Sequence, residues 1–139
     1  MTSPAPGPLV LIVDDNEKNL KLARDVLRAA GFRTLDAVNG AEALTLATEY
    51  LPDVVLLDLR LPDMDGVDVA RELRDRTRTR LIPVVALSAL RRPGDTNELH
   101  AAGFAGYLEK PISVAAFPDE VRSYCPRGAS TPPGGKRTC

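Results

Sequence analysis

Two apolar runs without a polar residue constrain the fold of this chain more than any other feature of its sequence. Residues 9–13 read Leu-Val-Leu-Ile-Val, and residues 54–57 read Val-Val-Leu-Leu. A strand with one face in water alternates apolar and polar side chains, so uninterrupted runs predict strands buried on both faces. Strands of that kind are typical of a parallel sheet that carries helices on each side.

Segments with the spacing of helices lie between and after these strands. Residues 16–30 place Leu20, Ala23 and Leu27 on one side of a helix, and Gly31 follows as a typical stop. Four more helices are expected. The first covers residues 39–50 and opens with Asn39 and Glu42 at the spacing of a capping box, and the second covers residues 66–77. The third is a short helix with Pro93 in its first turn that ends before Gly103, and the last runs from near Phe117 to near Tyr124.

Three weaker runs complete a five-stranded pattern, and they cover residues 33–36, 82–87 and 105–108. Pro83 lies near the start of its run, where a missing backbone donor is tolerated. Strands that alternate with helices predict an α/β fold with a doubly wound, five-stranded parallel sheet and helices on both faces.

The composition is that of a single, almost neutral domain. The chain has 139 residues, with 19 acidic and 18 basic side chains, which gives no general reason to expect nucleic-acid or membrane binding. Five arginines fall within residues 71–80, but Glu72 and Asp75 interrupt them, so a solvated face is favoured. Neither a secretion signal nor a run long enough to span a membrane is visible, so a cytoplasmic protein is expected.

The ends of the chain differ in composition from its middle. Residues 1–7 are predicted to form a flexible leader, residues 8–124 the folded domain, and residues 125–139 a disordered tail rich in Pro and Gly. Both cysteines, Cys125 and Cys139, fall in the tail, which favours a reducing compartment. No DNA-binding domain is expected in so short a tail.

Polar residues stand where the predicted strands end. Asp14 and Asp15 follow the first strand, Asp58 the third, Ser88 the fourth, and Lys110 comes shortly after the fifth. Taken singly, each has an ordinary explanation as a helix cap or a turn residue. The carboxyl ends of parallel strands meet at one edge of a sheet, however, so together these residues predict a single site.

Carboxylates gathered in this way call for a cation. Two like charges about 4 Å apart repel each other by roughly 4 kcal/mol at an effective dielectric constant near 20. Either one carboxyl keeps its proton or a metal ion occupies the site. Oxygen ligands without His or Cys favour a hard divalent ion, and Mg²⁺ is the expected one.

This pattern resembles the receiver domains of bacterial two-component response regulators, which belong to the CheY-like superfamily. The resemblance covers residues 8–124 and includes Pro62 and Gly66 in the loop after Asp58. The segments at residues 13–19 and 110–114 look most like single-domain, DivK-like regulators. The resemblance implies a flavodoxin-like strand order of 2-1-3-4-5.

The resemblance also implies roles for the acidic residues. Asp58 would be the nucleophile that takes a phosphoryl group from a phosphohistidine. Asp15 would bind Mg²⁺ directly, and Asp14 would do so directly or through water. Asp58 itself and the backbone carbonyl of Arg60 would complete the protein ligands.

Three further residues take part in what the resemblance implies. Lys110, which precedes Pro111 in a candidate cis peptide bond, would pair with a phosphoryl oxygen, and the Ser88 hydroxyl would donate to another. Movement of Ser88 would let Tyr107 turn inward and so reshape the surface near the last strand. The alternative for Tyr107 is an ordinary surface aromatic on an edge strand.

The expected function is that of a phospho-acceptor rather than a turnover enzyme. Its partners would be a histidine kinase or a histidine phosphotransfer protein upstream and an effector protein downstream. Two alternatives stay open at this stage: a Mg²⁺-dependent phosphohydrolase, and an interaction module that works without phosphorylation.

Overall fold

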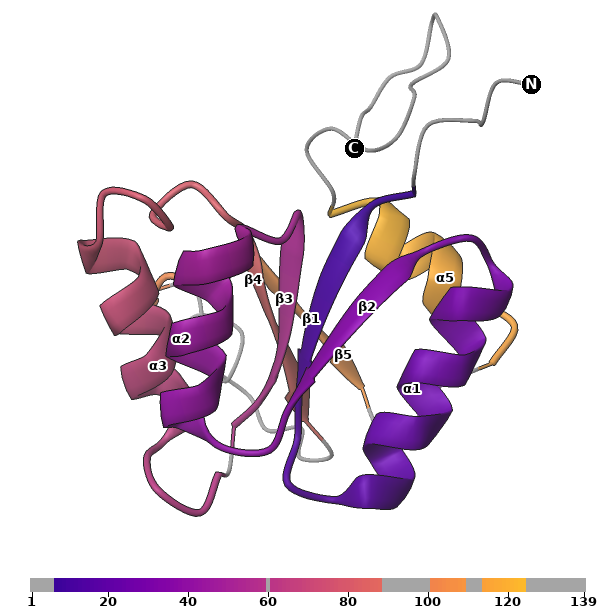
Figure 1. Ribbon diagram of the computed structural model, residues 1–139, viewed down its shortest axis with the longest axis horizontal. Helices are drawn as coiled ribbons and strands as arrows, with labels where there is room; N and C mark the ends of the chain where they lie inside the picture. The colour runs from indigo at the N-terminus through magenta and orange to yellow at the C-terminus, as the bar shows by residue number, and fades with distance from the viewer. Residues whose placement is uncertain (1–6, 60, 89–100, 110–113, 125–139) are drawn as a thin grey trace, which may run out of the picture.

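The computed structural model describes residues 7–59, 61–88, 101–109 and 114–124. Its centre is a parallel sheet in the order β2-β1-β3-β4-β5 (Figure 1), which confirms the predicted fold class and strand order. The strands are β1 (Leu9–Val13), β2 (Arg33–Ala37), β3 (Val54–Asp58), β4 (Val84–Ser88) and β5 (Gly106–Glu109). The helices are α1 (Glu17–Ala29), α2 (Gly40–Tyr50), α3 (Gly66–Asp75) and α5 (Phe117–Arg122).

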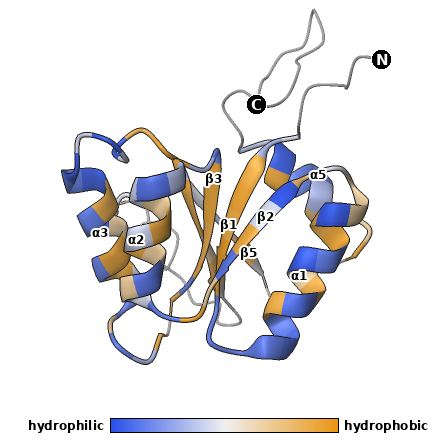
Figure 2. Cartoon of the chain, viewed as in Figure 1, coloured by the Kyte–Doolittle hydropathy of each residue, from blue (hydrophilic) through white to orange (hydrophobic). Residues whose placement is uncertain are grey.

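The helices cover both faces of the sheet, with α1 and α5 on one side and α2 and α3 on the other (Figure 1). Alternate residues of the central strands supply the two cores. Val10 and Ile12 pack with α1 and α5, whereas Leu11 and Val13 pack with α2 and α3. The central strands β1, β3 and β4 are therefore apolar up to the last residue of β3 and β4 (Figure 2), which is why their sequences do not alternate.

The element boundaries follow the predictions to within about two residues, and three of the differences illustrate this. The helix α3 ends at Asp75, two residues early, and β5 begins at Gly106, one residue late. The strand β4 begins at Val84, after Pro83, whose carbonyl accepts a hydrogen bond from Val55 of β3. Because Pro83 has no N–H to give, regular pairing starts only beyond it.

The last helix, α5, begins at Phe117 as predicted, and Pro118 lies in its first turn, where a proline needs no backbone hydrogen bond to donate. The helix expected from Pro93 lies outside the described residues, as do residues 1–6 and 125–139. The predicted leader and tail consequently stay predictions. No helix in the described part of the chain has both the length and the apolar character needed to cross a membrane.

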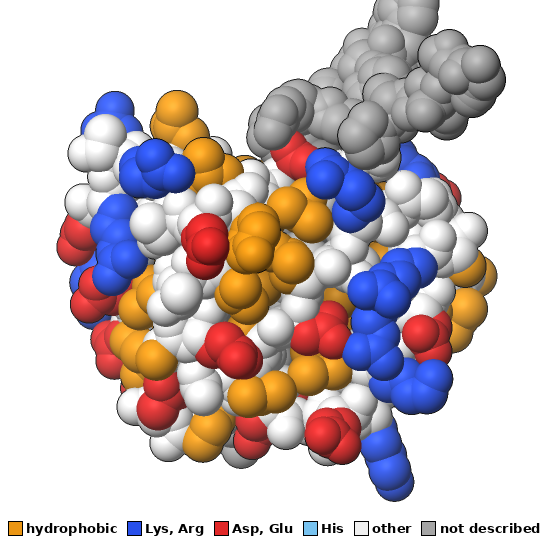
Figure 3. Space-filling view, in the orientation of Figure 1, with side chains coloured by type: hydrophobic (Ala, Val, Ile, Leu, Met, Phe, Trp, Pro, Cys, Tyr) orange, Lys and Arg blue, Asp and Glu red, His pale blue; other side chains and the backbone are white. Residues whose placement is uncertain are grey.

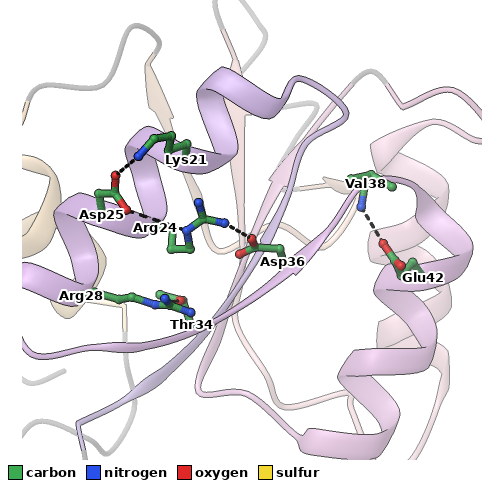
Figure 4. Close-up of polar contacts among 8 residues, drawn as sticks. All are labelled: Lys21, Arg24, Asp25, Arg28, Thr34, Asp36, Val38 and Glu42. Carbon is green, nitrogen blue, oxygen red and sulfur yellow. Dashed lines mark hydrogen bonds and ion pairs between the residues drawn. The ribbon is translucent and has the colours of Figure 1, made fainter.

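Polar contacts join α1 to the half-polar edge strand β2 (Figure 4). The Arg24 guanidinium lies 2.6 Å from the Asp36 carboxylate, and Arg28 donates to the Thr34 hydroxyl at 2.8 Å. The Arg28–Thr34 contact is exposed and the Arg24–Asp36 pair is half-buried. Ion pairs at exposed positions add at most about 1 kcal/mol, so these contacts contribute modestly to stability.

The arginines of residues 71–80 lie on the surface, interspersed with acidic side chains, as Figure 3 shows for one face of the molecule. Two of them reach across to α2, where Arg76 donates to the Thr48 hydroxyl at 3.1 Å and Arg78 to the Thr48 carbonyl. Arg76 also lies 3.6 Å from Glu72. These contacts agree with a solvated face that also ties α3 to α2.

The loop after β3 folds back tightly at Gly66. Its N–H donates to the Leu59 carbonyl at 3.0 Å. A Cβ atom at Gly66 would lie 2.7 Å from the Asp58 carbonyl oxygen and 2.8 Å from the Leu59 Cα. The start of α3 therefore approaches the end of β3 more closely than any side chain allows.

We predict that Gly66→Ala lowers the free energy of unfolding by about 1–3 kcal/mol, because the added methyl group would meet backbone atoms that cannot move aside. Urea unfolding followed by circular dichroism measures the change. Asp68→Ala, an exposed position in the same helix, is the control and should alter stability by less than about 0.5 kcal/mol. Equal stability of Gly66→Ala and the parent protein would show that the backbone approach is not restrictive.

Candidate functional site

Three carboxylates meet at the carboxyl edge of the sheet, as the sequence predicted. Asp14 and Asp15 follow β1, and Asp58 is the last residue of β3. These strands are neighbours in parallel register, with Val13 opposite Leu57, so the residues that follow come level. One carboxylate oxygen from each of the three lies within 4.8 Å of the others.

The three acids differ in their exposure to solvent. Asp14 is buried, with 1% of its surface exposed, and Asp58 exposes 9%. Asp15 is exposed. The cluster thus has a buried floor and one side open to solvent, which leaves a path for a small ion.

Backbone hydrogen bonds hold the first two acids in place. The Asp14 N–H donates to the Ala37 carbonyl at the end of β2 at 3.0 Å, and Asp14 Oδ1 accepts from the Asn16 N–H at 2.9 Å. The Asn16 side chain in turn caps α1 by accepting from the N–H groups of Lys18 and Asn19. Because Asn16 is the cap, the explanation of Asp14 or Asp15 as the cap of this helix is wrong, whereas Asp14 does close a local turn onto Asn16.

Of the remaining predicted site residues, Ser88 and Tyr107 lie within the described part of the chain, and two others lie outside it. Ser88 ends β4 at the same edge of the sheet, and its side chain is not described. Tyr107 of β5 pairs with Ala86 and packs, half-buried, against the core on the α2–α3 side. Arg60 and Lys110 lie outside the described residues, so their assigned roles stay predictions.

The donor set fits a hard divalent cation. All three groups offer oxygen, and at 4.8 Å two unit charges repel by about 3.5 kcal/mol at an effective dielectric constant of 20. A cation between them would remove that repulsion, and carboxylate oxygens are what Mg²⁺ accepts. The arrangement can therefore hold such an ion beside Asp58.

In the loop after β3, Asp63 makes a contact that the sequence pattern does not predict. Its two carboxylate oxygens accept from the N–H groups of Gly40 and Ala41, at 2.7 and 3.0 Å. The two N–H groups, with Gly40 as the larger contributor and Ala41 as the second, hold the pKa of the Asp63 carboxyl below its ordinary value. More than twenty residues separate the partners, and no local sequence pattern pairs them.

The capping box at α2 is confirmed with one change. The Asn39 side chain accepts from the Glu42 N–H at 2.8 Å, as expected. The Glu42 carboxylate, however, accepts from the Val38 N–H at 2.8 Å, one residue before the position that a standard capping box uses (Figure 4). The first three N–H groups of α2 therefore have side-chain acceptors: Asp63 accepts from Gly40 and Ala41, and Asn39 accepts from Glu42.

Comparison with protein families gives one match across most of the chain. Residues 10–122 match the response regulator receiver domain family. The polar-differentiation response regulator DivK of Brucella anthropi is 44% identical over 115 residues, which cover 83% of this chain and 94% of that protein. The DivK of Brucella ovis is 43% identical over the same share of each chain.

Solved structures agree with the sequence comparison. The chemotaxis response regulator CheY4 of Vibrio cholerae superimposes with a TM-score of 0.80 at 26% identity, over 85% of this chain and 98% of that one. The receiver domain of the sensor histidine kinase PA1611 from Pseudomonas aeruginosa has a TM-score of 0.77 at 32% identity, over 85% and 97%. That receiver domain was solved with a magnesium ion coordinated in its active-site cleft.

We predict that Asp15→Asn raises the free energy of unfolding of the metal-free protein by about 0.5–1 kcal/mol, because it removes one of the three neighbouring negative charges. The gain is small because Asp15 is exposed, so solvent already screens much of the repulsion. Urea unfolding in the presence of a chelator measures this. Addition of Mg²⁺ should reverse the order, since ligand binding stabilises the parent protein more than the variant.

Glu17→Gln is the matched control, since it removes an exposed acid two residues away in the first turn of α1. Loss of a negative charge near a helix N-terminus should leave stability unchanged or lower it by up to about 1 kcal/mol. If both substitutions shift stability in the same direction and Mg²⁺ stabilises both variants equally, Asp15 is not part of a charge cluster.

Proposed function

Because the chain belongs to the response regulator receiver domain family, we propose that Asp58 is the residue on which it accepts the phosphoryl group in two-component signalling. The observation that carries this assignment is the position of Asp58 at the end of β3, inside the cluster of three carboxylates. Asp14 is less suited to attack, since it is almost fully buried and one of its oxygens accepts from Asn16.

Phosphoryl transfer to Asp58 is a balanced exchange of bonds. A carboxylate oxygen of Asp58 forms a bond to phosphorus, while the bond between phosphorus and the donor's imidazole nitrogen breaks. The electron pair of the broken bond stays on that nitrogen. The product is an acyl phosphate on Asp58.

We propose Mg²⁺ as the cofactor, held by Asp15 and Asp58, by Asp14 directly or through water, and by the backbone carbonyl of Arg60. The support is the oxygen-only cluster of this chain together with the magnesium ion in the similar Pseudomonas domain. When bound, the ion offsets negative charge on the carboxylates and on the incoming phosphoryl oxygens.

The remaining site residues are assigned on their place at the same edge of the sheet. Lys110 follows the end of β5, where its ammonium would pair with a phosphoryl oxygen, and Ser88 ends β4, where its hydroxyl would donate to another. Tyr107 is half-buried beside this edge, a position from which it can respond to Ser88. We propose that this response is the output of the switch.

We propose that the domain comprises residues 8–124, that its donor is a histidine kinase or a histidine phosphotransfer protein, and that it signals to an effector protein by contact. The folded part described here is one receiver domain, as in DivK. We further propose that it is no turnover enzyme and that it acts in the cytoplasm.

We predict that acetyl phosphate with Mg²⁺ adds one phosphoryl group to the protein, detected as a mass increase of the intact chain. Asp58→Ala should remove this labelling, because it removes the carboxylate oxygen that would form the bond to phosphorus. Asp65→Asn, an acidic residue of the same loop, should label at the parental rate. Unchanged labelling of Asp58→Ala would overturn the assignment.

We predict that the parent protein does not turn over a small phosphomonoester such as para-nitrophenyl phosphate. A colorimetric assay at high protein concentration checks this, with Asp58→Ala as the blank. Sustained release of product that depends on Asp58 would instead favour a phosphohydrolase.

A further inference from the structure

Residues 37–41, called the turn below, run from the last residue of β2 to the second residue of α2 and contact the segments after both β1 and β3. On one side, the Ala37 carbonyl accepts from the N–H of Asp14 at 3.0 Å. On the other side, the N–H groups of Gly40 and Ala41 donate to the Asp63 carboxylate at 2.7 and 3.0 Å. The turn thus links the residues after β1 to the loop after β3.

The loop after β3 starts next to the phospho-acceptor. It leaves Asp58 and returns at Gly66, whose N–H donates to the Leu59 carbonyl at 3.0 Å. That bond lies within the loop. The hydrogen bonds between the described part of the loop and the turn are those that the Asp63 carboxylate accepts from Gly40 and Ala41. The two oxygens of one carboxylate accept from two consecutive N–H groups, so both the position and the orientation of Asp63 are fixed.

Side-chain packing supports the same link. A Cβ atom at Gly40 would lie 2.4 Å from the Met64 Cγ and 2.6 Å from its sulfur. Met64 therefore fills the space directly above Gly40, next to the Asp63 contact, and it also packs against the core on the α2–α3 side. A larger residue at position 40 would have to displace the Met64 side chain.

We propose that Asp63 is a positioning residue for phosphoryl acceptance: its carboxylate holds the loop after Asp58 at a fixed distance from the segment that carries Asp14 and Asp15. This inference rests on the proposed function, because it concerns the geometry of that site. Asp63 is not one of the residues to which we assign the metal or the phosphoryl group. It acts through the backbone on either side of the cluster.

The donors that hold Asp63 also keep it charged. The N–H groups of Gly40 and Ala41, followed by those of Asp63 and Met64 themselves, lower the pKa of its carboxyl. An aspartate is already a carboxylate at neutral pH, and the lowered pKa extends the charged state further into the acid range, at the positive end of α2 where a negative charge is favourable. The link does not depend on small changes of pH near neutrality.

Two substitutions separate positioning from simple stability. Asp63→Ala removes the link between loop and turn, whereas Asn39→Ala removes the neighbouring cap of α2, which accepts from Glu42, and leaves the loop untouched. Both should lower the unfolding temperature, because both leave α2 donors without a partner. Asp65→Ala is the charge control, since Asp65 lies in the same loop and makes no side-chain cap bond.

The first readout is amide hydrogen exchange of the metal-free protein. In Asp63→Ala the N–H of Gly66, bonded to Leu59, should exchange about tenfold faster than in the parent protein, because the loop loses its contact with the turn. The second readout is the Mg²⁺ dissociation constant from calorimetry, which should rise about fivefold in Asp63→Ala and stay within about twofold in Asn39→Ala and Asp65→Ala.

The proposal is overturned if Asp63→Ala is folded and shows parental exchange at Gly66 and parental Mg²⁺ affinity. It is equally overturned if Asn39→Ala weakens Mg²⁺ binding as much as Asp63→Ala does, since helix stability would then explain both. If the parent protein itself binds no Mg²⁺, the metal assignment fails instead, and the exchange rate of Gly66 alone decides whether Asp63 holds the loop.

Discussion

The parallel register of β1 and β3 is the constraint on which the site depends. It brings the ends of two adjacent strands level, so that Asp14, Asp15 and Asp58 must share a small volume. The same register places apolar side chains on both faces of those strands, where two separate cores hold them. The repulsion among the acids is therefore borne by a sheet that cannot easily spread to relieve it.

Contacts of backbone N–H groups hold the described parts of the loops around the cluster. Asn16 closes the turn after β1, and Gly66 lets the chain after β3 return against its own strand. Asp63 then connects that loop to the start of α2. Each contact involves a backbone N–H group, which has little freedom to move, so the positions of the acids follow from the fold itself.

The central strands and the acidic cluster could be predicted from the sequence because their signals are local. An uninterrupted apolar run at residues 54–57 followed directly by Asp58 specifies both a buried strand and what stands at its end. The start of β4 was misplaced because strand propensity took precedence over the missing N–H of Pro83. The contact of Asp63 with Gly40 was missed because it joins distant segments, and only the folded loop brings them together.

The cluster acts on ions through its own field and not through the charge of the protein. The chain carries a formal charge of only −1, so there is no long-range attraction for cations. The three oxygens lie within 4.8 Å of one another, well inside the Debye length of about 8 Å at physiological ionic strength. Asp14 and Asp58 are also largely shielded from solvent, so salt at that strength leaves part of the repulsion between them in place. A divalent ion remains the most direct way to neutralise it, and that same ion would stand beside the oxygen that receives the phosphoryl group.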